Sequence, residues 1–293
     1  MNAEARLRAF AAVARRGSFS GAAEELVISQ PAVSKHVAEL EAELGTKLFV
    51  RLPRGVRLTE TGQFVADHVL RAEAILAQAR RGVASIGRTL GGTLTVGASG
   101  NGMYLLPAAL DAFHRAHPGV EVHVAVSTSS EIAEAVRAHQ VEVGIVGGFA
   151  AAPELEAEQL VEDEIVLVAS PALARRIKRA KDLDSLTWIA REEGSSTRAV
   201  VEAAWSDLGI SPSHRLSFPS WEGVKLTVAA GAGVAAMSRY AIDVELRART
   251  LAMVKVRGWN VRRHLSLVRP RGIPLTPPAQ RFVEALRRTL PAA

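Results

Sequence analysis

The sequence predicts an α/β protein with an N-terminal winged helix-turn-helix, a long linker helix and a C-terminal α/β domain. Three observations point to this fold class: short capped helices before residue 59, a heptad repeat from there to residue 90, and alternating β-rich and helical segments from residue 93 onward. The 293 residues suffice for two or three compact units. An apolar fraction of 48% is enough for buried cores and argues against a disordered chain.

The composition excludes several kinds of chemistry. Cysteine is absent, so the chain has no disulfide framework, thiolate metal site or cysteine nucleophile, which fits a reducing cytosol. The uncharged stretch Thr89–Leu110 contains five glycines and a proline and would make a poor membrane helix. The apolar run Ala9–Ala14 is too short for a secretory signal, so a cytoplasmic location is expected.

The net charge of +6 is unevenly distributed along the chain. Residues 1–92 carry 13 Lys and Arg against 9 Asp and Glu, whereas residues 93–293 carry 23 against 21. The N-terminal third therefore holds most of the excess positive charge, which suggests a polyanionic partner. The excess is modest, and many proteins that bind no DNA show the same bias.

Apolar spacing and capping residues predict three helices at the N-terminus. The first is expected from Ala3 to Arg16, and the second follows Ser18, whose hydroxyl suits an N-cap. Ser29 caps the third helix, which begins with Gln30-Pro31, where proline is well tolerated. Two short helices joined by a tight turn are typical of a helix-turn-helix, whose second helix enters the major groove by its N-terminal end.

The residues at the start of the third helix suit base recognition. Gln30 can form paired hydrogen bonds with an adenine edge, Ser34 can donate or accept, and Lys35 projects near phosphates or a guanine. The β-rich runs 49–51 and 56–58 predict a wing in which Arg51 and Arg54 would hold the DNA backbone or the minor groove. A surface hairpin with solvated arginines explains the wing equally well.

The fixed spacing of many residues in this region resembles the LysR-type transcriptional regulators. The residues that carry the resemblance are Leu7, Phe10, Val13, Gly17-Ser18-Phe19-Ser20, Ala22-Ala23, Leu26, Ser29-Gln30-Pro31-Ala32-Val33-Ser34, Leu40-Glu41, Leu44-Gly45, Leu48-Phe49, Arg51 and Leu58-Thr59-x-x-Gly62. The resemblance implies a sequence-specific DNA-binding regulator that is not an enzyme. It also implies which side chains contact DNA: Gln30, Pro31, Ser34 and Lys35 in the groove, and Ser29, Arg51 and Arg54 at the backbone.

A heptad seam predicts a linker helix over residues 59–90, behind a DNA-binding domain of residues 1–58. The seam consists of Val65, Val69, Ala72, Leu76, Ala79, Val83, Ile86 and Leu90. Such a seam would be exposed on an isolated helix, so a second copy is expected to cover it, although a helix lying on its own domain is the alternative. In the family this helix forms the dimer, which implies an inverted-repeat operator. Members of the family usually assemble as tetramers, so the resemblance also implies a homotetramer. Gly91-Gly92 is expected to break the helix as a hinge.

Residues 93–293 alternate β-rich runs with helical segments, which predicts a sheet of the parallel type. This part resembles the two-lobed sensor domain of the LysR family, which is similar to periplasmic binding proteins. The resemblance implies that residues 93–163 and 268–293 form lobe I and that residues 164–267 form lobe II.

Three loops that precede helices are candidates for an effector site between the lobes, because helix N-termini attract anions. They contain Ser99, Gly100 and Asn101, then Thr128 and Ser129, and finally Ser195, Ser196, Thr197 and Arg198. Each loop alone also suits an ordinary helix cap, whereas three in register favour a pocket. Their hydroxyls and amides suit a carboxylate or a phosphorylated metabolite, to which Arg198 would add a charge-assisted contact.

The third loop resembles a Glu-x-Gly-Ser-x-Thr-Arg pattern in the branch of the family that includes regulators of carbon fixation and sulfur assimilation. Trp221 departs from that branch, where a smaller polar residue is common. It would either line the cleft or belong to the core.

Other chemistry finds less support. The glycines Gly97-x-x-Gly100-x-Gly102 differ in order from a dinucleotide loop, and no acidic residue ends the next strand. His114 and His117 lack a third ligand at suitable spacing for a metal, and no Gly-x-Ser-x-Gly elbow is present. No cofactor is therefore expected. A solute-binding or enzymatic α/β protein with an incidental basic N-terminus is the alternative to an effector-responsive regulator.

Overall fold

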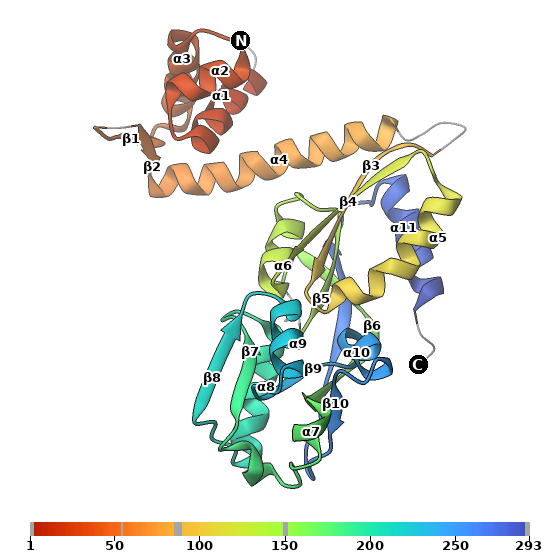
Figure 1. The fold of residues 1–293 in the computed structure, drawn as a ribbon. Helices are drawn as coiled ribbons and strands as arrows, with labels where there is room; N and C mark the ends of the chain where they lie inside the picture. The colour runs from red at the N-terminus through yellow and green to blue at the C-terminus, as the bar shows by residue number, and fades with distance from the viewer. Residues whose placement is uncertain (1–2, 54, 85–89, 149–151, 291–293) are drawn as a thin grey trace. The chain divides into compact units, whose positions relative to one another are not determined.

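The computed structural model describes residues 3–53, 55–84, 90–148 and 152–290. The chain divides into two compact units, Met1–Gln78 and Ala79–Ala293. Figure 1 labels the elements of both units. Each unit has hydrophobic clusters of its own.

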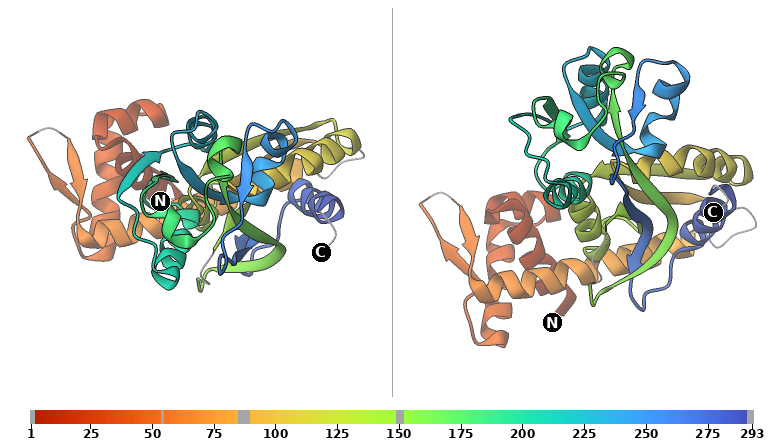
Figure 2. Two further views of the ribbon diagram at one scale, coloured as in Figure 1. Left: turned by 60° about the horizontal axis from the view of Figure 1, so that its bottom comes forward. Right: turned by 90° about the horizontal axis from the view of Figure 1, so that it is seen from below.

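The first unit contains three short helices, a hairpin and most of a long helix. In chain order these are α1 (Ala3–Arg16), α2 (Phe19–Leu26), α3 (Gln30–Leu44), β1 (Phe49–Arg51), β2 (Val56–Leu58) and α4 (Glu60–Ala84). The expected caps are present, since Ser18 Oγ accepts from Gly21 N at 3.0 Å and Ser29 Oγ accepts from Ala32 N at 3.4 Å. The expected winged helix-turn-helix is confirmed, and Figure 2 shows the hairpin projecting from the helices.

Two glycines allow close backbone approaches around the hairpin. Gly55 has a left-handed φ of 80°, and a Cβ there would lie 2.7 Å from the carbonyl oxygen of Gly17. A Cβ on Gly62 would lie only 2.0 Å from the carbonyl oxygen of Leu48. Thr59 begins the same turn, because its Oγ1 accepts from Gly62 N at 2.9 Å and donates to Lys47 O at 2.8 Å. The Thr59-x-x-Gly62 motif therefore fixes the start of α4 against the residues before β1.

The heptad seam on α4 divides into two parts. Val65 and Val69 pack into the core of the first unit, so for them the alternative of a helix lying on its own domain holds. Ala72, Leu76, Ala79 and Val83 are exposed. The seam ends earlier than expected: Ile86 lies outside the described residues, and the expectation that Leu90 continues the helix is wrong.

Leu90 and the glycines after it belong to the second unit. Leu90 packs instead against a hydrophobic cluster of that unit. Gly92 is the first residue of strand β3 and has a φ of 93°, so the Gly91-Gly92 pair marks the entry to a strand.

The second unit is built on a nine-stranded mixed sheet. Eight strands follow the order β4-β3-β5-β11-β6-β9-β7-β8, and the ninth, β10, pairs with β6. Its strands are β3 (Gly92–Ser99), β4 (Val120–Ser127), β5 (Val143–Gly147), β6 (Leu155–Ala169), β7 (Thr187–Arg191), β8 (His214–Phe218), β9 (Val234–Ser238), β10 (Ala252–Val254) and β11 (Val261–Pro270). Its helices are η1 (Gly102–Leu105), α5 (Leu106–Ala116), α6 (Ser129–Arg137), α7 (Pro171–Ala174), η2 (Ala180–Leu183), α8 (Ser196–Leu208), α9 (Trp221–Ala229), η3 (Arg239–Ile242), α10 (Asp243–Arg247) and α11 (Pro277–Thr289).

Strands β6 and β11 join the two lobes. They pair antiparallel from Val261↔Ile165 to Pro270↔Leu155, with a register shift at Leu265/Ser266. On one side β3, β4 and β5 are parallel to one another, and on the other side β7 is parallel to β8 and β9. We call the half with β3, β4, β5, α5, α6 and α11 lobe I, and the half with β7–β10, α8 and α9 lobe II. The sheet is thus parallel within each lobe and antiparallel where the lobes join.

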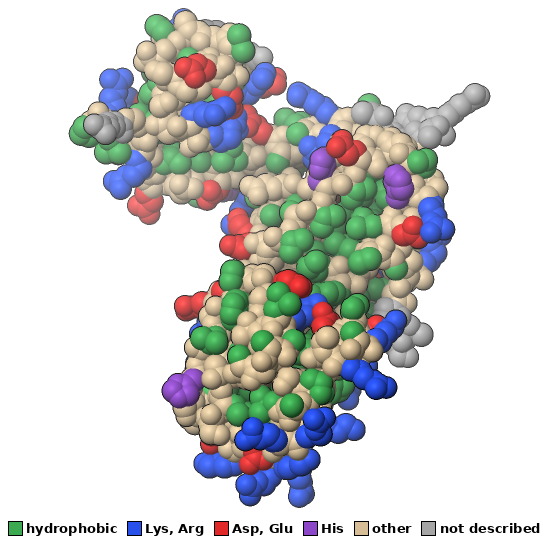
Figure 3. Space-filling model, in the orientation of Figure 1, with side chains coloured by type: hydrophobic (Ala, Val, Ile, Leu, Met, Phe, Trp, Pro, Cys, Tyr) green, Lys and Arg blue, Asp and Glu red, His purple; other side chains and the backbone are tan. Residues whose placement is uncertain are grey.

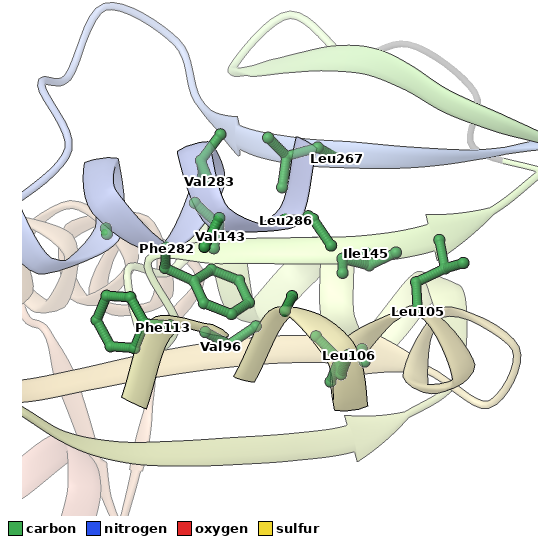
Figure 4. Close-up of a cluster of buried hydrophobic side chains, with 14 of the residues drawn as sticks. Val96, Leu105, Leu106, Phe113, Val143, Ile145, Leu267, Phe282, Val283 and Leu286 are labelled. Carbon is green, nitrogen blue, oxygen red and sulfur yellow. The ribbon is translucent and has the colours of Figure 1, made fainter. Parts of the chain in front are cut away.

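Lobe I has a core between its sheet and the helices α5 and α11. Figure 4 shows Phe113 of α5 and Phe282 of α11 beside each other, with Val96 and Ile145 of the sheet close by. The rings of Phe113 and Phe282 pack edge to face with centroids 5.8 Å apart. The C-terminal helix therefore completes lobe I after the chain has passed through lobe II.

Positive charge also gathers on the second unit. Lys and Arg gather at the far end of lobe II, around α7 and η2 (Figure 3). The segment contains five exposed cations: Arg175, Arg176, Lys178, Arg179 and Lys181. Positive charge is therefore no special mark of the first unit, and other observations must carry the DNA-binding assignment.

Candidate functional site

The N-terminal end of α3 presents the side chains that the sequence singles out. Ser29, Gln30, Pro31 and Lys35 are exposed, and Ser34 is partly exposed. Within the described part of the chain, the side chains of Gln30, Ser34 and Lys35 form no hydrogen bond to another residue. Their polar groups are therefore available to a partner.

A buried carboxylate holds α3 to the residues that lead into the hairpin. Glu41 Oε1 accepts from Leu48 N at 2.9 Å and from Phe49 N at 3.4 Å, and its Oε2 accepts from Lys47 Nζ at 2.6 Å. Burial acts to raise the pKa of Glu41, but the Lys47 ammonium and the Leu48 amide outweigh it and hold the pKa below the ordinary 4.5. Glu41 therefore fixes the position of the hairpin relative to the helix that precedes it.

The hairpin carries two exposed arginines among the described residues. Arg51 lies at the end of β1, as expected, whereas Arg54 lies outside the described residues. Arg57 on β2, opposite Val50, is also exposed and escaped the sequence analysis. Its alternation with the partly buried Val56 and Leu58 is the signal that could have identified it.

In the second unit, the three predicted loops meet at one small polar cavity that is open to solvent and offers about 20 Å³ to the centre of a water-sized molecule. The cavity is lined by Ser99, Gly100, Asn101, Ser127, Thr128, Ser129, Arg191, Glu192, Ser195, Ser196, Thr197 and Trp221. All of the predicted effector-site residues except Arg198 are in this set. Hydroxyl groups dominate it, and they can donate to an anion or accept from an alcohol.

Direct hydrogen bonds connect the lobe I and lobe II sides of the cavity. Asn101 Nδ2 donates to Thr197 Oγ1 at 2.8 Å. The hydroxyls of Ser129 and Ser196 lie 3.2 Å apart, and Ser129 Oγ also accepts from Gly147 N at 3.2 Å. These residues therefore couple the position of α8 in lobe II to loops of lobe I.

A buried ion pair, which the sequence analysis did not predict, binds the residues at the start of α8. Arg263 on β11 donates from Nε to Asp163 Oδ2 at 3.0 Å, from Nη1 to Ser196 Oγ at 2.9 Å and from Nη2 to Thr197 Oγ1 at 3.0 Å. Asp163 Oδ1 accepts from Ser238 Oγ at 2.5 Å. Burial raises the pKa of Asp163, and the Arg263 guanidinium opposes that rise. The pair lies where β6 and β11 join the lobes, so it ties α8 to both connecting strands.

The cation at the cavity is Arg191 and not Arg198. Arg198 Nε donates to Glu202 at 2.9 Å, and this side chain lines an adjoining crevice of lobe II that shares Arg191 and Trp221 with the cavity. Arg191, at the end of β7, lies over the ring of Trp221 with its Cζ 5.1 Å from the ring centroid. Trp221 meets both expectations for it, because it lines the cavity and also belongs to a buried cluster of lobe II.

The glycines that could have indicated a dinucleotide-binding loop have packing roles, and the histidines belong to no metal-binding cluster among the described residues. A Cβ on Gly97 would lie 2.8 Å from Ile132, and one on Gly102 would lie 2.4 Å from the carbonyl oxygen of Ile145. Among the described residues, no group of three or more His, Cys, Asp or Glu side chains could hold a metal ion. None of the helices among the described residues of either unit is long and apolar enough to cross a membrane.

Comparison with known proteins identifies both units. The family described as "Bacterial regulatory helix-turn-helix protein, lysR family" matches residues 5–63, and "LysR substrate binding domain" matches residues 87–291. A RuBisCO operon transcriptional regulator from Allochromatium vinosum is 34% identical over 281 residues, which cover 95% of this chain and 93% of the relative. The name of this relative agrees with the predicted resemblance to the branch of the family that contains carbon-fixation regulators.

Solved structures are similar in fold. A structure of full-length CbnR complexed with its target DNA has a TM-score of 0.68 and 24% identity, covering 99% of this chain and all of that one. The regulatory domain of CcmR from Synechocystis PCC6803 in complex with 2-PG has a TM-score of 0.61 and 22% identity, covering 67% of this chain and 96% of that one. The predicted fold and the prediction of a DNA-binding regulator and not an enzyme are confirmed. The chain belongs to the LysR family of bacterial helix-turn-helix transcriptional regulators.

Proposed function

We propose that a small anionic metabolite, a carboxylate or a phosphorylated compound, binds the cavity between the lobes and changes how an oligomer of this chain contacts its operator. The observation that carries the proposal is the meeting of three separate loops, from both lobes, at one cavity lined by hydroxyls and an arginine. The structure of the CcmR regulatory domain in complex with 2-PG, which is similar in fold, supports this ligand class. The proposed contacts are Ser99, Gly100, Asn101, Thr128, Ser129, Ser195, Ser196, Thr197 and Trp221.

A thermal-shift screen of small carboxylates and phosphorylated metabolites on the full chain tests this proposal. A ligand that binds only the folded state raises the melting temperature by mass action. Each hit is then added to a footprinting assay, where the length of the protected DNA or its bend should change. Thr128→Val and Ser129→Ala should weaken every true hit, whereas Arg281→Gln, on an exposed ion pair of α11, should not. Unchanged footprints with every hit would contradict the proposal.

We also propose that Gln30, Pro31, Ser34 and Lys35 contact base edges and groove, with Ser29, Arg51 and Arg54 at the backbone. The exposure of the α3 N-terminal end and the unpaired side chains there support this assignment. Replacing Gln30 and Ser34 together by alanine should cost about 1–3 kcal/mol per lost base contact and reduce discrimination against altered operators. Arg51→Ala is the comparison, since it should weaken binding to all sequences alike and reduce the salt dependence. Unchanged sequence discrimination in the double variant would refute the assignment.

We infer that the exposed part of the α4 seam pairs with a second copy of the chain. Leu76 is 55% exposed and Val83 is 69% exposed, which is unusual for large aliphatic side chains spaced along one helix face. Light scattering should therefore show that Leu76→Glu with Val83→Glu lowers the oligomeric state, while Asp67→Lys on the opposite face of the same helix does not. A homotetramer on an inverted repeat is the proposed assembly, and the cytoplasm is the proposed location. An unchanged mass for the double variant would rule out this interface.

We place the lobe boundaries where the sequence suggested them, with residues 93–163 and 268–293 in lobe I and 164–267 in lobe II. Support comes from the two strands that run through both lobes, since residue 163 falls within β6 and residue 268 within β11.

A further inference from the structure

The two charged side chains at the effector cavity form an ion pair with each other. Of the residues that line the cavity, only Arg191 and Glu192 are charged. They are neighbours in the chain, at the end of β7 and the start of the loop before α8. The side chain of Arg191 is 10% exposed and that of Glu192 is 29% exposed. The cavity is therefore electrically neutral when its two charged groups face each other.

The pairing occupies the edge of the guanidinium group that best suits an oxyanion. Arg191 Nε donates to Glu192 Oε2 at 2.7 Å, and Nη2 donates to Glu192 Oε1 at 2.7 Å. Two parallel N–H donors of this kind are how arginine binds a carboxylate or a phosphoryl group in general. Glu192 thus stands where the oxygens of an anionic ligand would bind.

The guanidinium itself is held by groups other than Glu192. Nη2 also donates to the carbonyl oxygen of Pro219 at 3.2 Å, and Trp221 packs against the charged group. Nη1 lies so close to Gly100 that a Cβ there would be 2.7 Å from it. Arg191 can therefore keep its position in the cavity while Glu192 moves away, because glutamate is the more exposed partner and Arg191 is the one hydrogen-bond partner of its carboxylate among the described residues.

The neighbouring arginines are engaged elsewhere. All three guanidinium nitrogens of Arg263 donate to Asp163, Ser196 and Thr197. Arg198 donates to Glu202 and is not among the residues that line the cavity. Among the described residues at this cavity, Arg191 is the cation that a ligand could reach.

We propose that Arg191 anchors the oxyanion of the effector and that Glu192 is an internal competitor, which the ligand displaces from the bidentate edge. This inference rests on the proposed function, since it names the recognition group for the same cavity. Glu192 begins the loop that leads into Ser196 and Thr197, and the main chain there is held by Glu192 N donating to Phe218 O at 3.1 Å and Ser195 N donating to Glu192 O at 3.3 Å. Exchange of one carboxylate for another thus occurs next to the residues that bond lobe II to lobe I.

Isothermal titration of the full chain with inorganic phosphate and, separately, with malonate tests the exchange. Glu192→Gln keeps the length of the side chain and removes the competing charge, so either probe should bind roughly tenfold more tightly, the equivalent of one charge-assisted hydrogen bond. Arg191→Met should abolish binding of both probes, and Arg191→Lys should restore only part of it because lysine lacks the paired donors. Glu158→Gln is the matched control, since Glu158 accepts the same kind of paired hydrogen bonds from Arg287 and does not line the cavity, and it should leave the affinity unchanged.

The outcomes separate this inference from the function on which it rests. If the wild-type chain binds a probe and Glu192→Gln binds it no more tightly, Glu192 is no competitor and the inference fails while the effector site stands. If neither the wild type nor Glu192→Gln binds an anion in this titration or in the metabolite screen, the proposed function fails with it. Thermal unfolding of each variant shows whether it is folded, and Glu192→Gln, which retains the arginine, keeps the test decisive if Arg191→Met unfolds.

Discussion

Replacing Arg263 by methionine should destabilise the second unit far more than an average substitution. The change removes the donors to Asp163, Ser196 and Thr197 and leaves the Asp163 carboxylate, which is 0% exposed, with Ser238 as its remaining hydrogen-bond donor. Breaking a buried ion pair from one side costs about 3–5 kcal/mol, because the other charge stays buried without compensation. For a unit of this size about 1 kcal/mol corresponds to roughly 2–4 °C, so the melting temperature should fall by roughly 6–20 °C.

Tryptophan fluorescence during thermal and urea unfolding measures this loss where it occurs. All four tryptophans of the chain, Trp188, Trp205, Trp221 and Trp259, belong to lobe II clusters, so their emission reports that lobe. Adding Asp163→Asn to the methionine variant removes the stranded charge and should recover much of the loss. A destabilisation below about 1 kcal/mol in the single variant, or simple additivity in the double variant, would show that the pair is not the buried constraint inferred here.

Three further results are expected from thermal unfolding. Gly62→Ala should destabilise the first unit by about 1–3 kcal/mol because its Cβ would meet the Leu48 carbonyl, whereas Gly82→Ala, where the nearest atom is 3.6 Å away, should be neutral or stabilising because alanine is the better helix former; equal effects would contradict the argument. The lowered pKa of Glu41 means that its stabilisation is present above its ordinary value of 4.5 and is lost as the pH falls through the folded value, so Glu41→Gln should flatten the stability of the first unit in acid; an unchanged profile would count against it. Burial raises the pKa of Glu142, although Thr276 and Arg81 oppose it, so this carboxyl costs stability as the pH rises above 4.5, and Glu142→Gln should be at least as stable as the wild type at pH 7.

The first unit was predictable because its signals are local. Caps at Ser18 and Ser29 and the spacing of buried residues specify three helices within one turn of their true ends. The seam on α4 was harder, since a heptad pattern does not reveal what covers each residue. Val69 is buried by its own unit, Leu76 is exposed, and Leu90 has left the helix altogether.

The second unit was predictable in its layers but not in its longest strands. β6 begins at Leu155, and its first half is hard to recognise from the sequence because Glu156, Glu158 and Glu162 interrupt the continuous apolar run that is typical of a buried strand. The loops of the cavity were found from their hydroxyls. The choice between Arg191 and Arg198 depends on the direction in which each side chain leaves its element, and only the folded chain shows that direction.

The bulge in the long ribbon of β6 and β11 has a mechanical consequence. At the register shift between Leu265 and Ser266, Leu160 on β6 has no partner in the ladder, while pairing continues on both sides of it. A bulge of this kind increases local twist without cutting the hydrogen-bonded ladder. The lobes are therefore joined by one continuous pair of hydrogen-bonded strands, and we expect their relative motion to twist this pair at the bulge. A ligand that moves one lobe should then strain the main-chain hydrogen bonds on either side of the bulge, so we expect the paired strands to resist lobe motion more than a flexible linker would.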